Sequence, residues 1–192
     1  MGTKATTYEN TTPLDLIMAG VLAGAAGTLA MDLLWYLRYK RDGGEDSFLD
    51  WELSSGTASY EQASAPAQVG KRLVEGYLQT ELPPHTARAM NNAVHWATGL
   101  LWGTAHGVLA GSTAKRRTSA GLATGAAAWA ASYAMLAPAK LYKPMWEYPT
   151  GVLWKDLSAH LIYGLGTGAA FRALTGDGSG GIDSVNGSPS TP

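Results

Sequence analysis

The chain has 192 residues, of which 14 are basic and 15 acidic, so its formal net charge is −1 and gives no indication of a nucleic-acid partner. It contains no cysteine, which excludes disulfides, thiolate nucleophiles and cysteine-bound metal or haem. The mean hydropathy of −0.05 is typical of a soluble protein, but this average conceals four apolar stretches that are nearly free of charge.

The four apolar stretches occupy residues 14–37, 93–110, 120–139 and 157–174. Apart from histidines, their only acidic or basic residues are Asp15, Asp32 and Arg172. A helix of a soluble protein normally carries a charged face, so the pattern favours an all-α membrane protein with four membrane-spanning helices. The stretch 93–110 has 18 residues, against a usual span of about 20, and a buried helix of a soluble protein is the alternative.

A polar insertion, residues 38–92, separates the first two spans. Pro66 suits the first turn of a helix, and the residues after it predict a short amphipathic helix at the membrane surface or against the bundle. The apolar face of this helix would be formed by Val69, Leu73, Val74, Tyr77 and Leu78. We therefore expect one membrane domain, residues 1–174, followed by a disordered tail rich in Gly, Ser, Asp and Pro, residues 175–192.

Four spans place the insertion and the loop 140–150 on one side of the membrane and both tails on the other. Basic residues occur on both sides, and we expect cytoplasmic tails because Lys115, Arg116 and Arg117 crowd a very short turn. The predicted location is therefore the cell membrane, with several spans. Aromatic residues then gather at one interface, namely Trp35, Tyr36, Trp146, Tyr148 and Trp154.

Glycine spacing indicates a duplicated helical hairpin, in which both copies face the same way. Aligning the copies places Gly24 on Gly125 and His95 on His160. Small residues at every fourth position allow helices to pack closely in lipid, which offsets the cost of about 1 kcal/mol for each glycine in a helix. The repeated packing residues are Gly20, Gly24 and Gly27 with Gly121 and Gly125, and Gly99 and Gly103 with Gly164 and Gly168.

Five ionisable residues in or near the spans are candidates for function, because such groups are costly in lipid and usually face the bundle interior or water. They are Asp32, His95, His106, Asp156 and His160.

Asp156 and His160 are one helical turn apart, so the carboxylate can orient or charge the imidazole. Three interpretations are open: histidines that fix helix register, a proton or cation path, and a haem or metal site that could pair His95 with His160. The haem or metal interpretation is not supported by any sequence motif with the spacing of metal ligands, so we expect no cofactor and no resident metal. No nucleophile motif or phosphate-binding loop is present, and we expect no catalytic residues.

Four segments carry a resemblance to known proteins: APAQVGKRLVEG (65–76), NNAVHWATGLLWGTAHG (91–107), LYKPMWEY (141–148) and KDLSAHLIYGLGTGAAFR (155–172). They resemble small uncharacterised membrane proteins of actinobacteria and related bacteria. The layout of one span, a long loop and three further spans is also similar, more distantly, to the YagU-like bacterial inner-membrane proteins. The resemblance implies a bacterial cytoplasmic membrane protein and brings no catalytic residues.

From these patterns we expect a structural or accessory protein of the lipid bilayer, packed through its glycine stripes internally or against a partner. That partner would be a second copy of the chain or another membrane protein. The alternative is a small transporter or channel that conducts protons or cations through intramembrane Asp and His residues.

Overall fold

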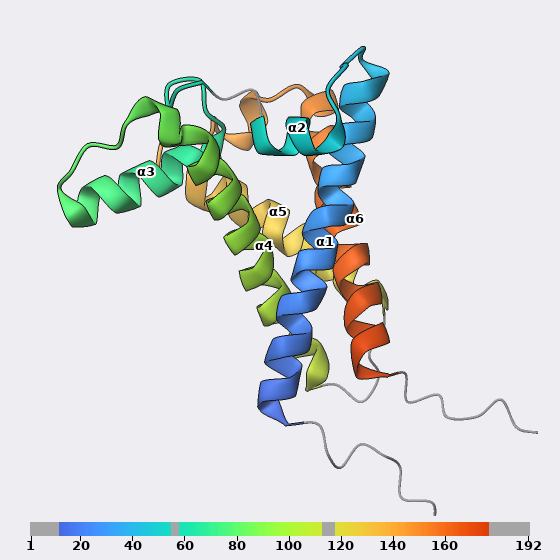
Figure 1. Ribbon diagram of the computed structural model, residues 1–192. Helices are drawn as coiled ribbons and strands as arrows, with labels where there is room; N and C mark the ends of the chain where they lie inside the picture. Colours follow the sequence, from blue (N-terminus) through green and yellow to red (C-terminus); the bar gives the residue numbers. More distant parts are fainter. Residues whose placement is uncertain (1–11, 55–57, 113–117, 177–192) are drawn as a thin grey trace, which may run out of the picture.

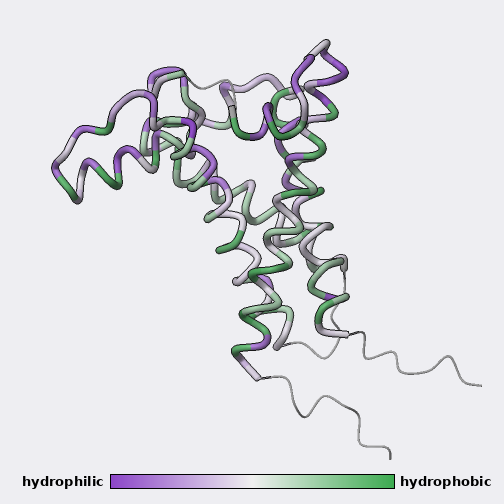
Figure 2. The backbone as a smooth tube through the Cα atoms, viewed as in Figure 1, coloured by the Kyte–Doolittle hydropathy of each residue, from purple (hydrophilic) through white to green (hydrophobic). Residues whose placement is uncertain are grey.

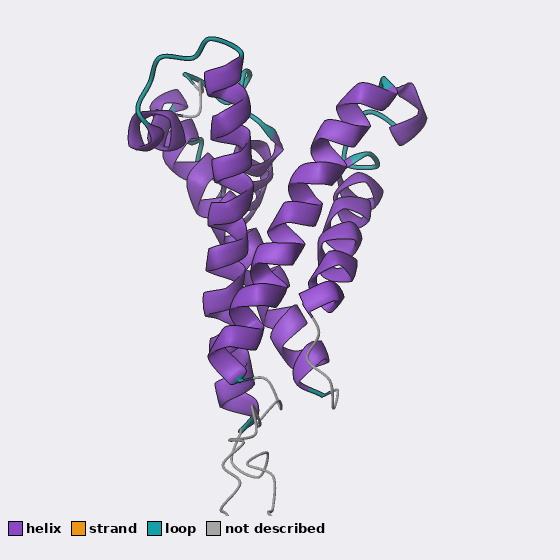
Figure 3. Cartoon of the chain, turned by 90° about the vertical axis from the view of Figure 1, so that its right-hand side faces the viewer, coloured by secondary structure: helices purple, strands orange, loops and turns teal. Residues whose placement is uncertain are grey.

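The computed structural model describes residues 12–54, 58–112 and 118–176, and over these residues the chain is helical with no β-strand (Figure 3). The all-α prediction is confirmed. The predicted tail from residue 177 onward and the turn holding Lys115, Arg116 and Arg117 lie outside the described residues. The elements are α1 (Pro13–Arg41), α2 (Phe48–Ser54), α3 (Ala65–Leu78), η1 (Pro84–Thr86), α4 (Ala87–Gly111), α5 (Thr118–Leu136), η2 (Met145–Glu147) and α6 (Thr150–Thr175).

The long helices agree with the four apolar stretches but differ at their ends. The helices α4 and α6 begin about six residues earlier than the apolar stretches that predicted them, and α5 ends at Leu136 rather than at residue 139. At the start of α1, the Thr12 side chain accepts a hydrogen bond from the Asp15 amide at 3.2 Å, and the Asp15 carboxylate accepts one from the Thr12 amide at 2.9 Å. This reciprocal cap explains the acidic residue at the edge of the first apolar stretch.

The helices α1 and α6 lie side by side, with α4 packed along α1 and α5 packed along α6. Both hairpins run in the same sense: α1 and α5 lead toward the end of the bundle that carries α2, and α4 and α6 return from it (Figure 1).

Glycines place the helix backbones in direct contact within each hairpin. A Cβ atom added at Gly20 would lie 2.7 Å from the carbonyl oxygen of Gly103, closer than such contacts normally come. In the second hairpin, a Cβ atom at Gly121 would lie on the carbonyl oxygen of Gly164, and one at Gly125 on that of His160. The glycine stripes therefore form the α1–α4 and α5–α6 interfaces.

The contacts also show how the two hairpins correspond. Gly103 faces Gly20 and Gly24, whereas Gly164 faces Gly121 and Gly125. Gly103 is thus the counterpart of Gly164, not of Gly168, and His160 does not correspond to His95 when Gly24 is matched with Gly125. The sequence alignment differs by one helical turn because glycines four residues apart offer equivalent packing positions.

The long helices bury few large side chains and expose many apolar ones. The largest fully buried side chains are Phe171, Thr28 and Thr167, whereas many large apolar side chains of the four long helices are exposed. Hydrophilic residues gather at the end of the bundle with α2 and α3, and the long helices are mainly hydrophobic (Figure 2). Among the described helices, one is long and apolar enough to span a membrane by length and composition: α1, with a mean hydropathy of 1.7 over 18 residues, a third of them buried.

The insertion contributes two helices at this end. The helix α3 matches the predicted amphipathic helix and projects crosswise from the bundle (Figure 1). It contacts α4 through small residues, with Gly70 against Met90 and Val94. Much of the predicted apolar face, including Leu73 and Tyr77, is therefore exposed. The helix α2 contacts both α1 and α4 and is held to α1 by an aromatic cluster of Tyr36, Tyr39, Phe48 and Trp51.

Candidate functional site

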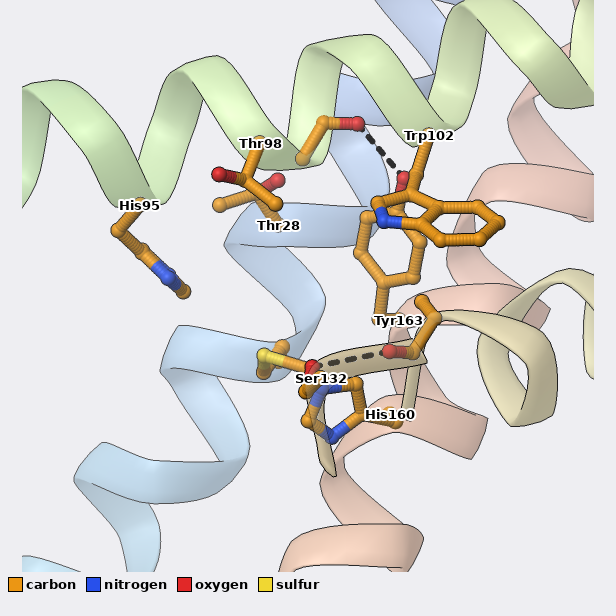
Figure 4. A pocket seen from close by; sticks show the side chains of 10 residues that line it. Thr28, His95, Thr98, Trp102, Ser132, His160 and Tyr163 are labelled. Carbon is orange, nitrogen blue, oxygen red and sulfur yellow. Dashed lines mark hydrogen bonds between the residues drawn. The ribbon is translucent and has the colours of Figure 1, made fainter. Parts of the chain in front are cut away.

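A small pocket of about 70 Å³, partly open to the outside, lies between the four long helices. His95 from α4 and His160 from α6 both line it, and Figure 4 shows them at different sides of the same space. Each of the four long helices contributes to the lining, so the pocket depends on the assembled bundle.

On the α4 side, His95 is held by a buried carboxylate of α1. The distance from His95 Nε2 to Asp32 Oδ1 is 2.9 Å, and Asp32 is 4% exposed. The second carboxylate oxygen, Asp32 Oδ2, is buried and has no hydrogen-bond partner. A carboxylate bonded to one ring nitrogen fixes the orientation of the imidazole and leaves the other nitrogen available.

A second carboxyl group, which sequence reasoning missed, lies close to this pair. Trp96 Nε1 donates a hydrogen bond of 3.0 Å to Glu52 Oε1, which brings α2 against α4 beside His95. Burial raises the pKa of the Glu52 carboxyl above its ordinary value, and the nearby Asp32 charge adds to this effect. Nothing in the sequence distinguishes Glu52 from the other acidic residues of the insertion.

On the α6 side, His160 Nδ1 lies 3.0 Å from the Asp156 carbonyl oxygen and 3.4 Å from Asp156 Oδ1. The expected proximity of these two residues is therefore observed. Tyr133 of α5 donates a hydrogen bond of 3.1 Å to Asp156 Oδ2 and ties the pair to the neighbouring helix. Because a carbonyl oxygen can only accept a hydrogen bond, His160 Nδ1 carries the hydrogen of this contact. The other ring nitrogen, Nε2, does not take part in the contact with Asp156.

His106 lies apart from the pocket. Its Nδ1 is 2.8 Å from Thr124 Oγ1 of α5, and its ring packs edge-on against Phe171 of α6 with centroids 5.4 Å apart. It is 3% exposed, so it is a buried polar link between three helices. Of the five candidates, the structure thus joins four as two histidine–carboxylate pairs, with both histidines on one pocket.

The described residues contain no group of three or more His, Asp or Glu side chains arranged to hold a metal ion. Within the part of the chain that the structure describes, a metal that uses His95 and His160 would have no further ligand of this kind.

No family model, curated protein or solved structure matches this chain. The functional argument therefore depends on the geometry of the bundle and its pocket.

Proposed function

We propose that the chain is an integral membrane protein that spans the bilayer with α1, α4, α5 and α6. The observation that carries this proposal is the placement of side chains. In α1 the outward residues include Leu22 and Leu33, while Thr28 and Asp32 are buried. In water this arrangement would expose apolar surface and bury polar groups, whereas in lipid it is the expected one.

Helix lengths support four spans. The helices α4 and α6 have 25 and 26 residues. At 1.5 Å per residue each is about 38 Å long, which exceeds the hydrocarbon thickness of about 30 Å. The helix α5, with 19 residues, reaches about 28 Å. The glycine, tryptophan, histidine and charged residues within α4 and α6 lower the mean hydropathy of these two helices.

The absence of cysteine permits a direct topology test in the cell membrane. Single cysteines replace Asp42 and Lys143 at one end of the bundle, and Ser112 and Gly176 at the other. With cytoplasmic tails, an impermeant maleimide should label the first pair in intact spheroplasts and the second pair only after permeabilisation. A chain that fractionates as soluble, or four sites that label equally in intact spheroplasts, would contradict the proposal.

We infer further that the bundle is a transporter or channel that conducts a small cation or protons. The supporting observation is the pocket that both histidine–carboxylate pairs reach. The glycines contact one another within the chain, which agrees with internal packing and does not by itself indicate a partner.

Flux measurements in proteoliposomes separate the two roles. We expect the wild type to dissipate an imposed pH or ammonium gradient, and Asp32→Asn and Asp156→Asn to reduce that flux at least tenfold. Glu61→Gln, in the exposed part of the insertion, is the control and should leave the flux unchanged. Wild-type protein that inserts but carries no flux would favour the accessory role.

A further inference from the structure

We propose that the histidine-lined pocket binds a small monovalent cation that donates hydrogen bonds, namely ammonium or a small protonated primary amine. This proposal names the ion for the transport function proposed above and rests on that function only in assuming that the bound ion crosses the membrane. Binding itself requires only the folded bundle.

The hydroxyl groups that line the pocket present acceptors to it. Thr28 Oγ1 donates to the Gly24 carbonyl at 2.9 Å, and Thr98 Oγ1 donates to the Val94 carbonyl at 2.7 Å. Likewise, Ser132 Oγ donates to the Ala128 carbonyl at 2.9 Å and Tyr163 OH to the Gly99 carbonyl at 2.7 Å; Figure 4 draws these last two bonds. A hydroxyl has one hydrogen, so all four groups retain only lone pairs for a guest.

The two histidines present acceptors as well. His160 Nδ1 donates toward Asp156, so the neutral ring offers the lone pair of Nε2. With Asp32 ionised, His95 Nε2 donates to Asp32 Oδ1, and the neutral ring offers the lone pair of Nδ1. With both histidines neutral, the hydroxyl and imidazole groups around the pocket therefore present acceptors, and the indole N–H of Trp102 is a donor of the lining.

The charges and the aromatic rings around the pocket favour a cation over a neutral hydrogen-bond donor. No Lys or Arg is among the lining residues, whereas carboxylates lie directly behind both histidines. Asp32 Oδ2 is buried without a partner, so the negative charge there is incompletely compensated. Trp102 and Tyr163 add aromatic rings, which attract cations over their faces. Ammonium groups combine positive charge with N–H donors and no acceptor, which complements this lining.

Binding is tested on the purified full chain in detergent, at constant ionic strength. The side-chain ¹⁵N resonances of His95 and His160 are followed during titration with ammonium chloride, methylammonium chloride, tetramethylammonium chloride and sodium chloride. We expect saturable shifts with the first two salts only, because tetramethylammonium lacks N–H donors and sodium lacks hydrogens. Absence of a response to ammonium, or an equal response to sodium or tetramethylammonium, would overturn the proposal.

Two threonines of α4 provide a matched pair of variants. Thr98 lines the pocket, whereas Thr104, which donates in the same way to the carbonyl four residues earlier, does not. We expect Thr98→Val to weaken ammonium binding roughly threefold to tenfold, the loss of one hydrogen bond, and Thr104→Val to leave it unchanged. Equal effects of the two variants would refute the pocket as the site.

The outcomes also distinguish this inference from the proposed function. A chain that inserts and carries protons but does not bind ammonium refutes only the inference. A chain that binds ammonium but shows no flux confirms the site and refutes transport.

Discussion

Asp32, His95 and Glu52 form a group of ionisable side chains where α2 meets α1 and α4. The buried Asp32–His95 contact of 2.9 Å resembles the carboxylate–histidine pairs that orient imidazoles in functional sites. Glu52 joins it through Trp96. An ionised Glu52 would add a second negative charge beside Asp32, which the protein tolerates poorly in a partly buried place.

This arrangement predicts a pH dependence of stability. Burial, with the Asp32 charge, raises the Glu52 pKa above its ordinary value of 4.5, although the Trp96 hydrogen bond and His95 oppose the rise. The folded state therefore holds this proton more tightly than the unfolded chain. The resulting stabilisation is present below about pH 4.5 and is lost as the pH rises through the folded-state pKa.

Glu52→Gln stays neutral and still offers an oxygen to Trp96. We expect this variant to lack the Glu52 contribution to the pH dependence and to melt at or slightly above the wild-type temperature at pH 7, by about 2 °C or less. Thermal unfolding in detergent from pH 4 to 8 measures the difference, with Glu61→Gln as an exposed control. Parallel curves for wild type and Glu52→Gln would show that this carboxyl is not perturbed.

At the scale of elements, backbone contact between helices explains why the chain contains so many glycines. In the proposed lipid environment, helix association brings little hydrophobic gain, so close approach and the resulting dispersion contacts would have to stabilise it. Each hairpin achieves this with the same geometry, while Gly27 extends close packing to the α1–α6 interface, where it meets Tyr163 and Thr167. The packing function of the stripes is therefore internal to the bundle.

Two glycines of α6 test this directly. A Cβ atom at Gly164 would lie on the Gly121 carbonyl oxygen, whereas one at Gly151 would meet nothing within 4 Å. We expect Gly164→Ala to destabilise the protein by about 1–3 kcal/mol. Gly151→Ala should be neutral or stabilise by up to about 1 kcal/mol, since alanine is the better helix former. Unfolding in detergent provides the comparison, and similar values for the two variants would contradict backbone contact.

At the scale of the whole molecule, the outward apolar surface is the observation that supports the proposed membrane environment. Leucines of α1 such as Leu22, 54% exposed, would be a liability in water, where large exposed apolar patches promote association. Polar groups are instead enclosed at the centre or gathered at the end that carries α2 and α3 (Figure 2).

An arginine on this surface should therefore prevent stable membrane insertion. Leu22→Arg places a charge at mid-depth of α1, where insertion costs about 2.5–3.5 kcal/mol. We expect a several-fold loss of membrane-integrated protein. Leu49→Arg, at a leucine of α2 that is more exposed than Leu22, should have no effect, because that helix lies outside the proposed spans. Wild-type levels of both variants after carbonate extraction of membranes would contradict a lipid-facing α1.

The sequence by itself determined the helical class, the approximate extent of the four long helices, α3, and the proximity of Asp156 to His160. These are local properties: apolar periodicity, proline and capping residues specify helices, and residues four apart are neighbours on any helix. Glycine spacing likewise predicted that the helices pack closely.

Only the tertiary structure decided which residues meet across helices. Asp32 contacts His95 although 63 positions separate them, and Glu52 reaches Trp96 from another helix. The pairing of Gly103, rather than Gly99, with the position of Gly164 also emerged only there. The physical reason is that contacts between helices depend on how each one slides and rotates against its neighbour. A stripe with a glycine at every fourth position permits more than one such register, and the sequence does not choose between them.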